Sequence, residues 1–217
     1  MPDASTNFVA VVLFLTAAAL VPLFVVTMTG FLKISVVMFL IRNALGTQQT
    51  PPNLVLYGIA LVLTVYVTTP LLGEIYNRLG SHPLEIRSVD DLTNVAQSVR
   101  GPIQVHLARF TLPSERQFFL SATTRIWPES ARTNVKDDDL VVLLPAFVGS
   151  ELTRAFEIGF LLYLPFLIID LVVSNILMAL GMIMVSPTLI SVPLKIFLFV
   201  AVSGWSRLMH GLILSYG

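Results

Sequence analysis

The chain has 217 residues, of which 55% are hydrophobic and only 12% are charged, and its mean hydropathy is +0.84. This composition excludes an ordinary soluble domain and indicates a protein that lies in or against a membrane. The thirteen basic and thirteen acidic residues cancel, so no net field favours nucleic acid, and the lack of cysteine excludes disulfides and thiolate metal sites.

The first 73 residues predict a hydrophobic helical hairpin region. Residues 8–30 carry no charge and are long enough to cross the roughly 30 Å of a bilayer core. They lack the basic start and cleavage site of a secretory signal, so we interpret them as a retained helix. Residues 31–45, which contain Lys33, are either a separate half-length helix or an extension of the first. Residues 54–73 are again uncharged and form the second full-length candidate.

A loop of uncharged and amide side chains, RNALGTQQTPPN, separates these apolar runs at positions 42–53. We expect Gly46 to take the left-handed position after a helix that ends near Leu45. The pair Pro51-Pro52 forbids helix before Asn53. Turn chemistry of this kind does not account for Thr47-Gln48-Gln49.

Polar residues concentrate after this region. Nine of the thirteen basic and eleven of the thirteen acidic residues lie between Glu74 and Glu157, which predicts a water-facing helical insert at 74–150. Ser114-Glu115-Arg116-Gln117 resembles a capping box that opens a helix through Arg125, and three aspartates at 137–139 suit the start of another helix. The short loops flanked by Lys33 and Arg42 favour a cytoplasmic side for 42–53 and a periplasmic side for the insert.

The remaining chain, 151–217, predicts a second hydrophobic hairpin region. Its apolar segments are 156–182 and 188–214, joined by GMIMVSP. Three prolines are expected to break these helices at membrane depth, which is tolerated only where neighbouring protein or a water-filled cavity satisfies the freed carbonyls. They are Pro165, Pro187 and Pro193.

Enzymatic motifs are missing from the sequence. There is no nucleophile elbow, no zinc-protease motif and no phosphate-binding loop. The three histidines, His82, His106 and His210, are scattered singly, so we interpret them as surface or interfacial residues. We therefore predict no enzyme, no cofactor and no metal site.

Three ionisable residues lie inside hydrophobic stretches: Lys33, Asp170 and Lys195. A charge at membrane depth costs about 2.5 to 3.5 kcal/mol on insertion scales unless it is paired or hydrated. Two interpretations remain open. Asp170 and a lysine neutralise each other inside a protein assembly, or the charges serve conduction; both imply protein partners.

Long stretches of the chain resemble one family. The quoted loop preceded by MTGFLKISVVMFLI, the block LLPAFVGSELTRAFEIGFLLYLPFLIIDLVVSNILMALGMIMVSP at 143–187, and SVPLKIFLFVAVSGW at 191–205 are similar to the R component of the type III secretion export apparatus, the family that includes the flagellar FliP proteins. These blocks cover about half the chain. RIWPESAR and the ending HGLILSYG are more similar to the virulence-type injectisome branch.

The resemblance implies an all-α protein of membrane-associated helical hairpins with a helical extracytoplasmic insert. It implies a pentameric ring assembled with small S subunits and one T subunit, next to the U and V components. This ring is the entry portal through which unfolded substrate polypeptides leave the cytoplasm. The implied location is the bacterial inner membrane within the secretion basal body, partly extracytoplasmic, with lipid contact and no nucleic acid.

The resemblance also assigns residues. A pore gasket is implied at Met182, Ile183 and Met184, where the family often has three methionines, because flexible thioether chains can close around nothing or around a passing polypeptide. Glu151 and Lys195 are implied at contacts between subunits, with Lys33 and Asp170 as further buried charges. Ser203 stands before the Gly-Trp pair, where family members often have an acidic residue. The signature loop, at the cytoplasm-facing end of its hairpin near partner subunits, comprises Arg42, Asn43, Gly46, Gln48, Gln49, Pro51, Pro52 and Asn53.

Two other functions remain possible from sequence. The chain could be a small proton-coupled transporter or channel component in which Asp170 is the titrating carboxylate, or a purely structural membrane scaffold. A transporter built from inverted repeats should have related halves. The sequence shows none.

Overall fold

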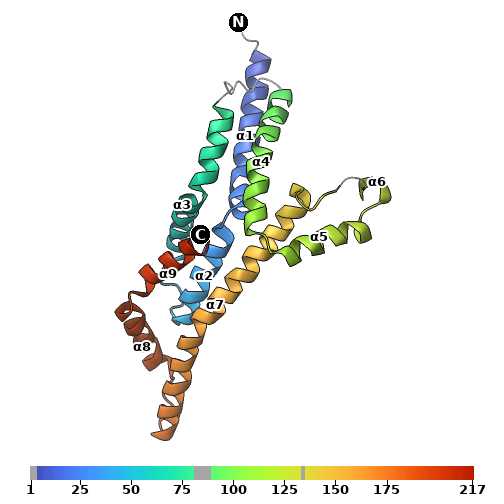
Figure 1. Cartoon of the computed structure of the whole chain (residues 1–217). Coiled ribbons are helices and arrows are strands. Elements are labelled where there is room, and N and C mark those ends of the chain that lie inside the picture. The colour runs from blue at the N-terminus through green and yellow to red at the C-terminus, as the bar shows by residue number, and fades with distance from the viewer. Residues whose placement is uncertain (1–3, 81–88, 133–134) are drawn as a thin grey trace. The chain divides into compact units, whose positions relative to one another are not determined.

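The computed structural model describes residues 4–80, 89–132 and 135–217, and these residues form an all-α fold (Figure 1). The expected fold class is therefore confirmed. The helices of this described part are α1 (Ala4–Met28), α2 (Phe31–Ala44), α3 (Asn53–Leu79), α4 (Val89–Phe110), α5 (Pro113–Ile126), α6 (Glu129–Arg132), α7 (Leu140–Ala179), α8 (Thr188–Ala201) and α9 (Gly204–Leu214).

The helices belong to two compact units. The first unit comprises Met1–Gly30 and Thr68–Glu151, and the second comprises Phe31–Val67 and Leu152–Gly217. Two helices, α3 and α7, contribute residues to both units because each continues through a unit boundary. The domain division expected from hydropathy, at 73 and 150, stays a prediction.

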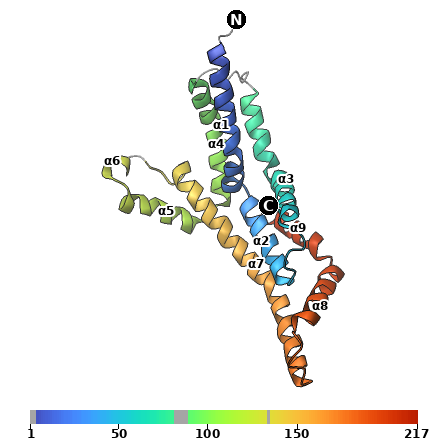
Figure 2. The same cartoon turned by 180° about the vertical axis from the view of Figure 1, so that it is seen from behind.

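The first unit is built around α4 and the beginning of α7. Both views place α1 and α4 side by side (Figures 1 and 2). Arg100 of α4 forms an ion pair with Asp139, 2.8 Å away, just before α7 begins. The two helices also meet where the His106 ring of α4 lies 6.5 Å from that of Phe147 of α7, and apolar side chains of both helices are buried. They are Leu107, Phe110, Val142, Leu143 and Phe147.

The start of α5 differs from the predicted capping box. The helix begins at Pro113, and its N-cap is Leu112, whose side chain cannot cap. The backbone φ angle of proline is fixed near the helical value, so Pro113 occupies the first helical position. Ser114 therefore lies inside the first turn and is not the N-cap. The Leu112 N–H instead donates to the Ser150 hydroxyl of α7 at 2.8 Å. Ser150 therefore satisfies the backbone N–H of the N-cap residue, and α5 has no side-chain cap.

In the second unit, α2 is the central helix. Its buried residues recur every three or four positions, as expected for a helix with a wide apolar face. They are Ile34, Val37, Met38, Ile41 and Ala44. The start of α3 packs on α2 through Tyr57, whose ring centroid lies 6.1 Å from that of Phe31 and 5.1 Å from that of Phe39. A Cβ at Gly159 of α7 would collide with Leu40, so glycine permits the close approach of α7 to α2.

Two helices are longer than the hydropathy pattern suggests. The expected end of the second hydrophobic helix near Gly73 is wrong, because α3 continues to Leu79. An ion pair between Glu74 and Arg78, four positions apart and 2.9 Å between charged atoms, supports these polar turns. Similarly, α7 begins at Leu140 rather than near 156, because a change from polar to apolar residues does not interrupt helical hydrogen bonding.

The prolines also behave differently from the prediction. Pro165 lies inside α7 and Pro193 inside α8, so neither ends a helix. Only Pro187 stands at a boundary, as the N-cap of α8. Each interior proline removes one backbone hydrogen bond, a loss that a long apolar helix survives when its other bonds remain.

The final apolar segment is broken instead at Ser203. The axes of α8 and α9 are bent by 63° at this break. Ser203 has left-handed backbone, with φ of 55°, and Gly204 follows with so little space that a Cβ would collide with the Phe199 ring. The sharp turn, rather than a proline, ends α8.

Within the described residues, α3 and α7 are each long and apolar enough to cross a membrane. Two broken pairs could each count as one further span. They are Ala18–Met28 with Phe31–Ala44, and Thr188–Ala201 with Gly204–Leu214.

Candidate functional site

The signature loop is closed on itself by Arg42. Its guanidinium donates to the Asn53 side-chain oxygen at 2.5 Å and to the Pro51 carbonyl at 3.3 Å. Gly46 has φ of +78°, and α3 begins at Asn53, so the expected glycine position and the expected helix start are both confirmed. The loop is therefore a fixed turn that joins the end of α2 to the start of α3.

The last four carbonyl groups of α2 all have donors, which a helix end otherwise lacks. The Leu45 N–H donates to the Ile41 backbone carbonyl at 3.0 Å, and the Gly46 N–H donates to the Asn43 backbone carbonyl at 3.0 Å. The remaining two acceptors are met by side chains. The Thr47 hydroxyl donates to the Arg42 carbonyl at 3.3 Å, and the Lys195 ammonium of α8 donates to the Ala44 carbonyl at 3.0 Å.

Turn chemistry did not account for the polar residues Thr47, Gln48 and Gln49, and this arrangement explains the first of them. Thr47 acts as a C-terminal cap of α2 through its side chain. Gln48 and Gln49, by contrast, are exposed. Their amides face outward from a turn whose backbone is held by other residues.

Lys195 connects three helices of the second unit. Besides capping α2, its ammonium forms an ion pair with the Asp170 carboxylate of α7 at 2.5 Å. The lysine is 4% exposed, whereas the aspartate side chain is 37% exposed. A cation at the C-terminal end of a helix also interacts favourably with the helix dipole. Asp170 therefore pairs with a lysine, as the first of the two interpretations expects, while the choice between a structural and a conducting role stays a prediction.

Gly46 packs directly under the same helix. A Cβ added at this position would lie 2.7 Å from a methyl group of Val192, one turn before Lys195 on α8. Glycine is thus required twice, by its positive φ and by the closeness of α8. The signature loop and α8 form one packed corner around the lysine.

Lys33 is fully buried at the other end of α2. Its ammonium lies 3.4 Å from the ring centroid of Tyr216, beside the end of α9. A desolvated cation over an aromatic face gains about 2 kcal/mol or more. The end of the chain thereby covers a charge that would be costly in an apolar helix.

The proposed gasket residues lie in a turn at the end of α7. The Met182 N–H donates to Leu177 at 2.9 Å and the Gly181 N–H donates to Met178 at 3.0 Å, which is the Schellman arrangement, with Gly181 at φ of +71°. The following side chains are uncovered: Met182 is 42% exposed, Ile183 85%, and Met184 fully. The helix end holds the backbone while these apolar side chains project.

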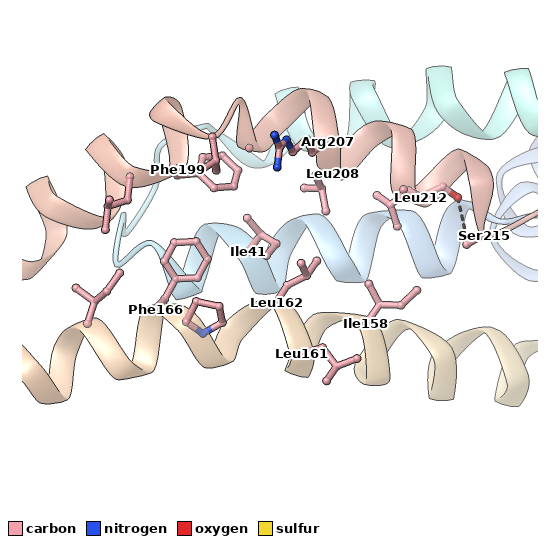
Figure 3. A pocket seen from close by; sticks show the side chains of 16 residues that line it. Ile41, Ile158, Leu161, Leu162, Phe166, Phe199, Arg207, Leu208, Leu212 and Ser215 are labelled. Atoms are coloured by element: carbon pink, nitrogen blue, oxygen red, sulfur yellow. Dashed lines mark hydrogen bonds between the residues drawn. The ribbon is translucent and has the colours of Figure 1, made fainter.

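The second unit also contains an apolar groove of about 680 Å³. Figure 3 shows its walls: Ile158, Leu162 and Phe166 from α7 face Leu208 and Leu212 from α9. Phe199 of α8 closes one end, with its ring centroid 6.1 Å from that of Phe166. Arg207 is the one charged residue of the lining.

The remaining predicted residues belong to other segments of the chain. Glu151 is fully buried on α7, in the first unit. His106 packs on Phe110 and Phe147, and burial, aided by the charge of Arg109, lowers its pKa. His210 is exposed, and His82 lies outside the described residues. The described part of the chain holds no cluster of three or more potential metal ligands.

Sequence reasoning identified the charged residues inside the apolar segments but not the groups that contact them. Tyr216, Val192 and the Ala44 carbonyl were not identified, although each contacts a predicted residue. A helix that ends before Gly46 leaves its last carbonyl groups without donors from the helix itself. The sequence therefore indicates that these carbonyl groups need a hydrogen-bond donor from elsewhere. No sequence signal says that this donor comes from α8.

The comparisons with known proteins agree with the resemblance. The family model described as the FliP family matches residues 14–212. The chain is 53% identical over 216 residues to the "Probable translocation protein y4yL" of Sinorhizobium fredii, covering all of this chain and 97% of that protein. It is 45% identical over 217 residues to the "Yop proteins translocation protein R" of Yersinia pestis, with 100% and 98% covered. It is 44% identical over 204 residues to the "Harpin secretion protein HrcR" of Erwinia amylovora, with 94% of each chain covered.

Proposed function

The chain belongs to the FliP family as an R component of the type III secretion export apparatus, and on this premise we propose that it builds a portal for unfolded polypeptides. Copies of the chain form a pentameric ring with S subunits and one T subunit in the bacterial inner membrane, partly extracytoplasmic. The U and V components lie next to it. The function is structural, and no catalytic step is required of the chain.

The exposed methionine turn carries the proposal. Met182 and Met184 project from a backbone that the Schellman hydrogen bonds hold at the end of α7. Uncovered apolar side chains at a fixed turn are costly in water, and symmetric copies can bury them against one another. Such a constriction excludes ions by dewetting, yet thioether chains move aside for a polypeptide.

The corner around Lys195 supports the same function, because it fixes the base of this turn. The lysine ties α8, which follows the turn, to α7, which precedes it, and to the C-terminal end of α2. The turn is therefore presented by helices that are joined through buried polar contacts. A seal that must reclose after each substrate needs such a fixed base.

The charges and the loop have separate assigned roles. The expected contact between Glu151 and Lys195 of neighbouring subunits stays a prediction, since the lysine is engaged by Asp170 within its own chain. The exposed amides Gln48 and Gln49 are free to contact partner subunits at the cytoplasm-facing end. Relatives named for Yop translocation and for harpin secretion favour the injectisome branch over the flagellar one.

The family assignment favours this function over a small proton-coupled transporter. That alternative needs Asp170 as a titrating carboxylate that exchanges protons with a substrate pathway. In this chain the carboxylate is engaged in an ion pair with Lys195 at 2.5 Å. A carboxylate that is paired with a lysine of its own chain suits a structural contact better than a proton carrier.

The test is replacement of both methionines by alanine. Met182→Ala with Met184→Ala should make the inner membrane of cells with assembled complexes leaky to small ions, because the apolar constriction widens. Export should continue or fall only modestly. The measurement is potassium efflux, alongside secretion of a reporter substrate.

Two controls make the result specific. Ile183→Met, which restores the run of three methionines usual in the family, should change neither readout. Met178→Ala removes a methionine of α7 itself that is 61% exposed and lies outside the turn, and it should also leave efflux unchanged. Unchanged efflux in an assembled double-alanine variant would mean that Met182 and Met184 are packing residues and that the seal lies elsewhere.

A further inference from the structure

The charged side chains of the second unit are few, and most of them have partners within the chain. The engaged residues are Lys33, Arg42, Arg154, Asp170 and Lys195. Two charges remain, one of each sign: Glu157 on α7 and Arg207 on α9. In the part of the chain that the structure describes, neither side chain forms a hydrogen bond or an ion pair, either with the other or with a third residue.

Both charges are exposed among apolar side chains. Glu157 is followed on the same face of α7 by Phe160 and Leu161, three and four positions along the helix, which are 64% and 66% exposed. Arg207 is exposed in the first turn of α9, where the helix dipole disfavours a cation. If protein covers these apolar side chains, the charges beside them lose water and need partners of opposite sign.

The two charges belong to different helices on opposite sides of the apolar groove. Figure 3 shows Arg207 on α9, whereas Ile158 and Leu161, which are neighbours of Glu157, belong to α7 on the other wall. Identical subunits in a ring meet head to tail, so that one surface of a copy contacts a different surface of the next copy. An anion on one surface and a cation on the other is the complementarity that such a contact needs.

We propose that Glu157 of one copy forms an ion pair with Arg207 of the next copy in the ring, and that the same contact covers Phe160 and Leu161. The inference rests on the ring of the proposed function and names a contact within it. A second copy of the chain suits the site because each copy supplies both halves of the pair in equal number. The contact also gives Arg207 the anion that its place in α9 favours.

Charge reversal tests the pair. Glu157→Arg places two cations at each junction between copies, and Arg207→Glu places two anions there. Each single variant should lower the yield of assembled complex about tenfold or more, because like charges at an interface are strongly unfavourable. The double variant restores opposite charges in exchanged positions and should recover most of the yield. Native mass spectrometry of the complex, co-expressed with its partner subunits, measures the yield, and a double variant no better than the single variants would refute the pair.

Cross-linking identifies the copies that meet, and the chain has no cysteine of its own to interfere. A chain with both Glu157→Cys and Arg207→Cys should give a ladder of linked copies when assembled complexes are treated with a short bismaleimide, because each copy reaches two neighbours. Either cysteine alone should give no ladder. Ile176→Cys with Arg207→Cys is the matched control, since Ile176 is also exposed on α7 but lies roughly 28 Å along the helix from Glu157.

Met184→Cys tests the ring separately from the proposed contact. Copies whose turns converge on one axis should be linked in pairs through this residue, whether or not Glu157 meets Arg207. Linked pairs from Met184→Cys without a ladder from the chain with cysteines at 157 and 207 would keep the ring and overturn the contact. Linkage from neither would remove the ring and the inference with it. A link from 157 or 207 to a different subunit, or between the two positions of one copy, would also overturn the inference.

Discussion

Replacement of Lys195 by methionine should loosen the C-terminal end of α2 while leaving the rest of the fold in place. Methionine keeps the length and apolar body of lysine but removes the ammonium group. Lys195 as a residue is 4% exposed, and its ammonium group donates to the Ala44 carbonyl at 3.0 Å and to the Asp170 carboxylate at 2.5 Å. Both partners lose their donor in one substitution.

The expected cost follows from these two contacts. A buried carbonyl group left without a donor costs about 1 to 3 kcal/mol. Breaking a fully buried ion pair costs about 3 to 5 kcal/mol, but Asp170 is 37% exposed and can be hydrated, so we assign about 1 kcal/mol to its loss. A total of about 2 to 4 kcal/mol corresponds to a roughly 30- to 800-fold faster local opening.

Hydrogen exchange measured by mass spectrometry on the assembled complex can read this opening directly. Amides of the peptide that contains residues 41–47 should exchange about 30- to 800-fold faster in Lys195→Met. Asp170→Asn keeps the cap on Ala44 and should accelerate exchange much less. Arg78→Met removes an exposed ion pair and serves as the control, with little change expected. Wild-type exchange of residues 41–47 in an assembled Lys195→Met complex would refute the capping role of the lysine.

Two further substitutions test the backbone of the second unit. Gly46→Ala should destabilise the complex by about 1 to 2 kcal/mol, because alanine is strained at positive φ and its Cβ meets Val192. Thermal unfolding measures this loss, and Val192→Ala in the same chain should restore part of it; no recovery would show that the clash is irrelevant. Ser203→Gly should stabilise the complex by up to about 1 kcal/mol, since glycine takes the left-handed position at the α8–α9 break without strain. A lower unfolding temperature for Ser203→Gly would contradict this account of the break.

Local patterns in the sequence were sufficient for several features. The stop of α2 before Gly46 and the start of α3 at Asn53 follow from glycine and proline chemistry, which acts within a few residues. Positions of the buried charges followed from hydropathy, and the family followed from long contiguous blocks. Predictions of helix ends that depend on distant groups were wrong. At the start of α5, for example, the Ser150 hydroxyl of α7 accepts a hydrogen bond from the Leu112 N–H.

Hydropathy was a weaker guide to where helices end than to where they lie. It placed an end near Gly73, whereas α3 continues to Leu79 through charged residues. It also predicted breaks at Pro165 and Pro193, which lie inside helices. Backbone hydrogen bonding continues across a change of solvent and survives the loss of a single donor, so neither signal stops a long helix.

The sequence by itself determined that this protein is helical and apolar and that Lys33, Asp170 and Lys195 would need partners. Only the tertiary structure decided which partners these are. Lys195 meets a carbonyl group 151 positions away and a carboxylate 25 positions away, and Lys33 meets the ring of Tyr216 at the far end of the chain. Periodicity and turn residues act over a few positions, whereas such pairings arise only when α2, α7, α8 and α9 pack together, and no local pattern encodes that packing.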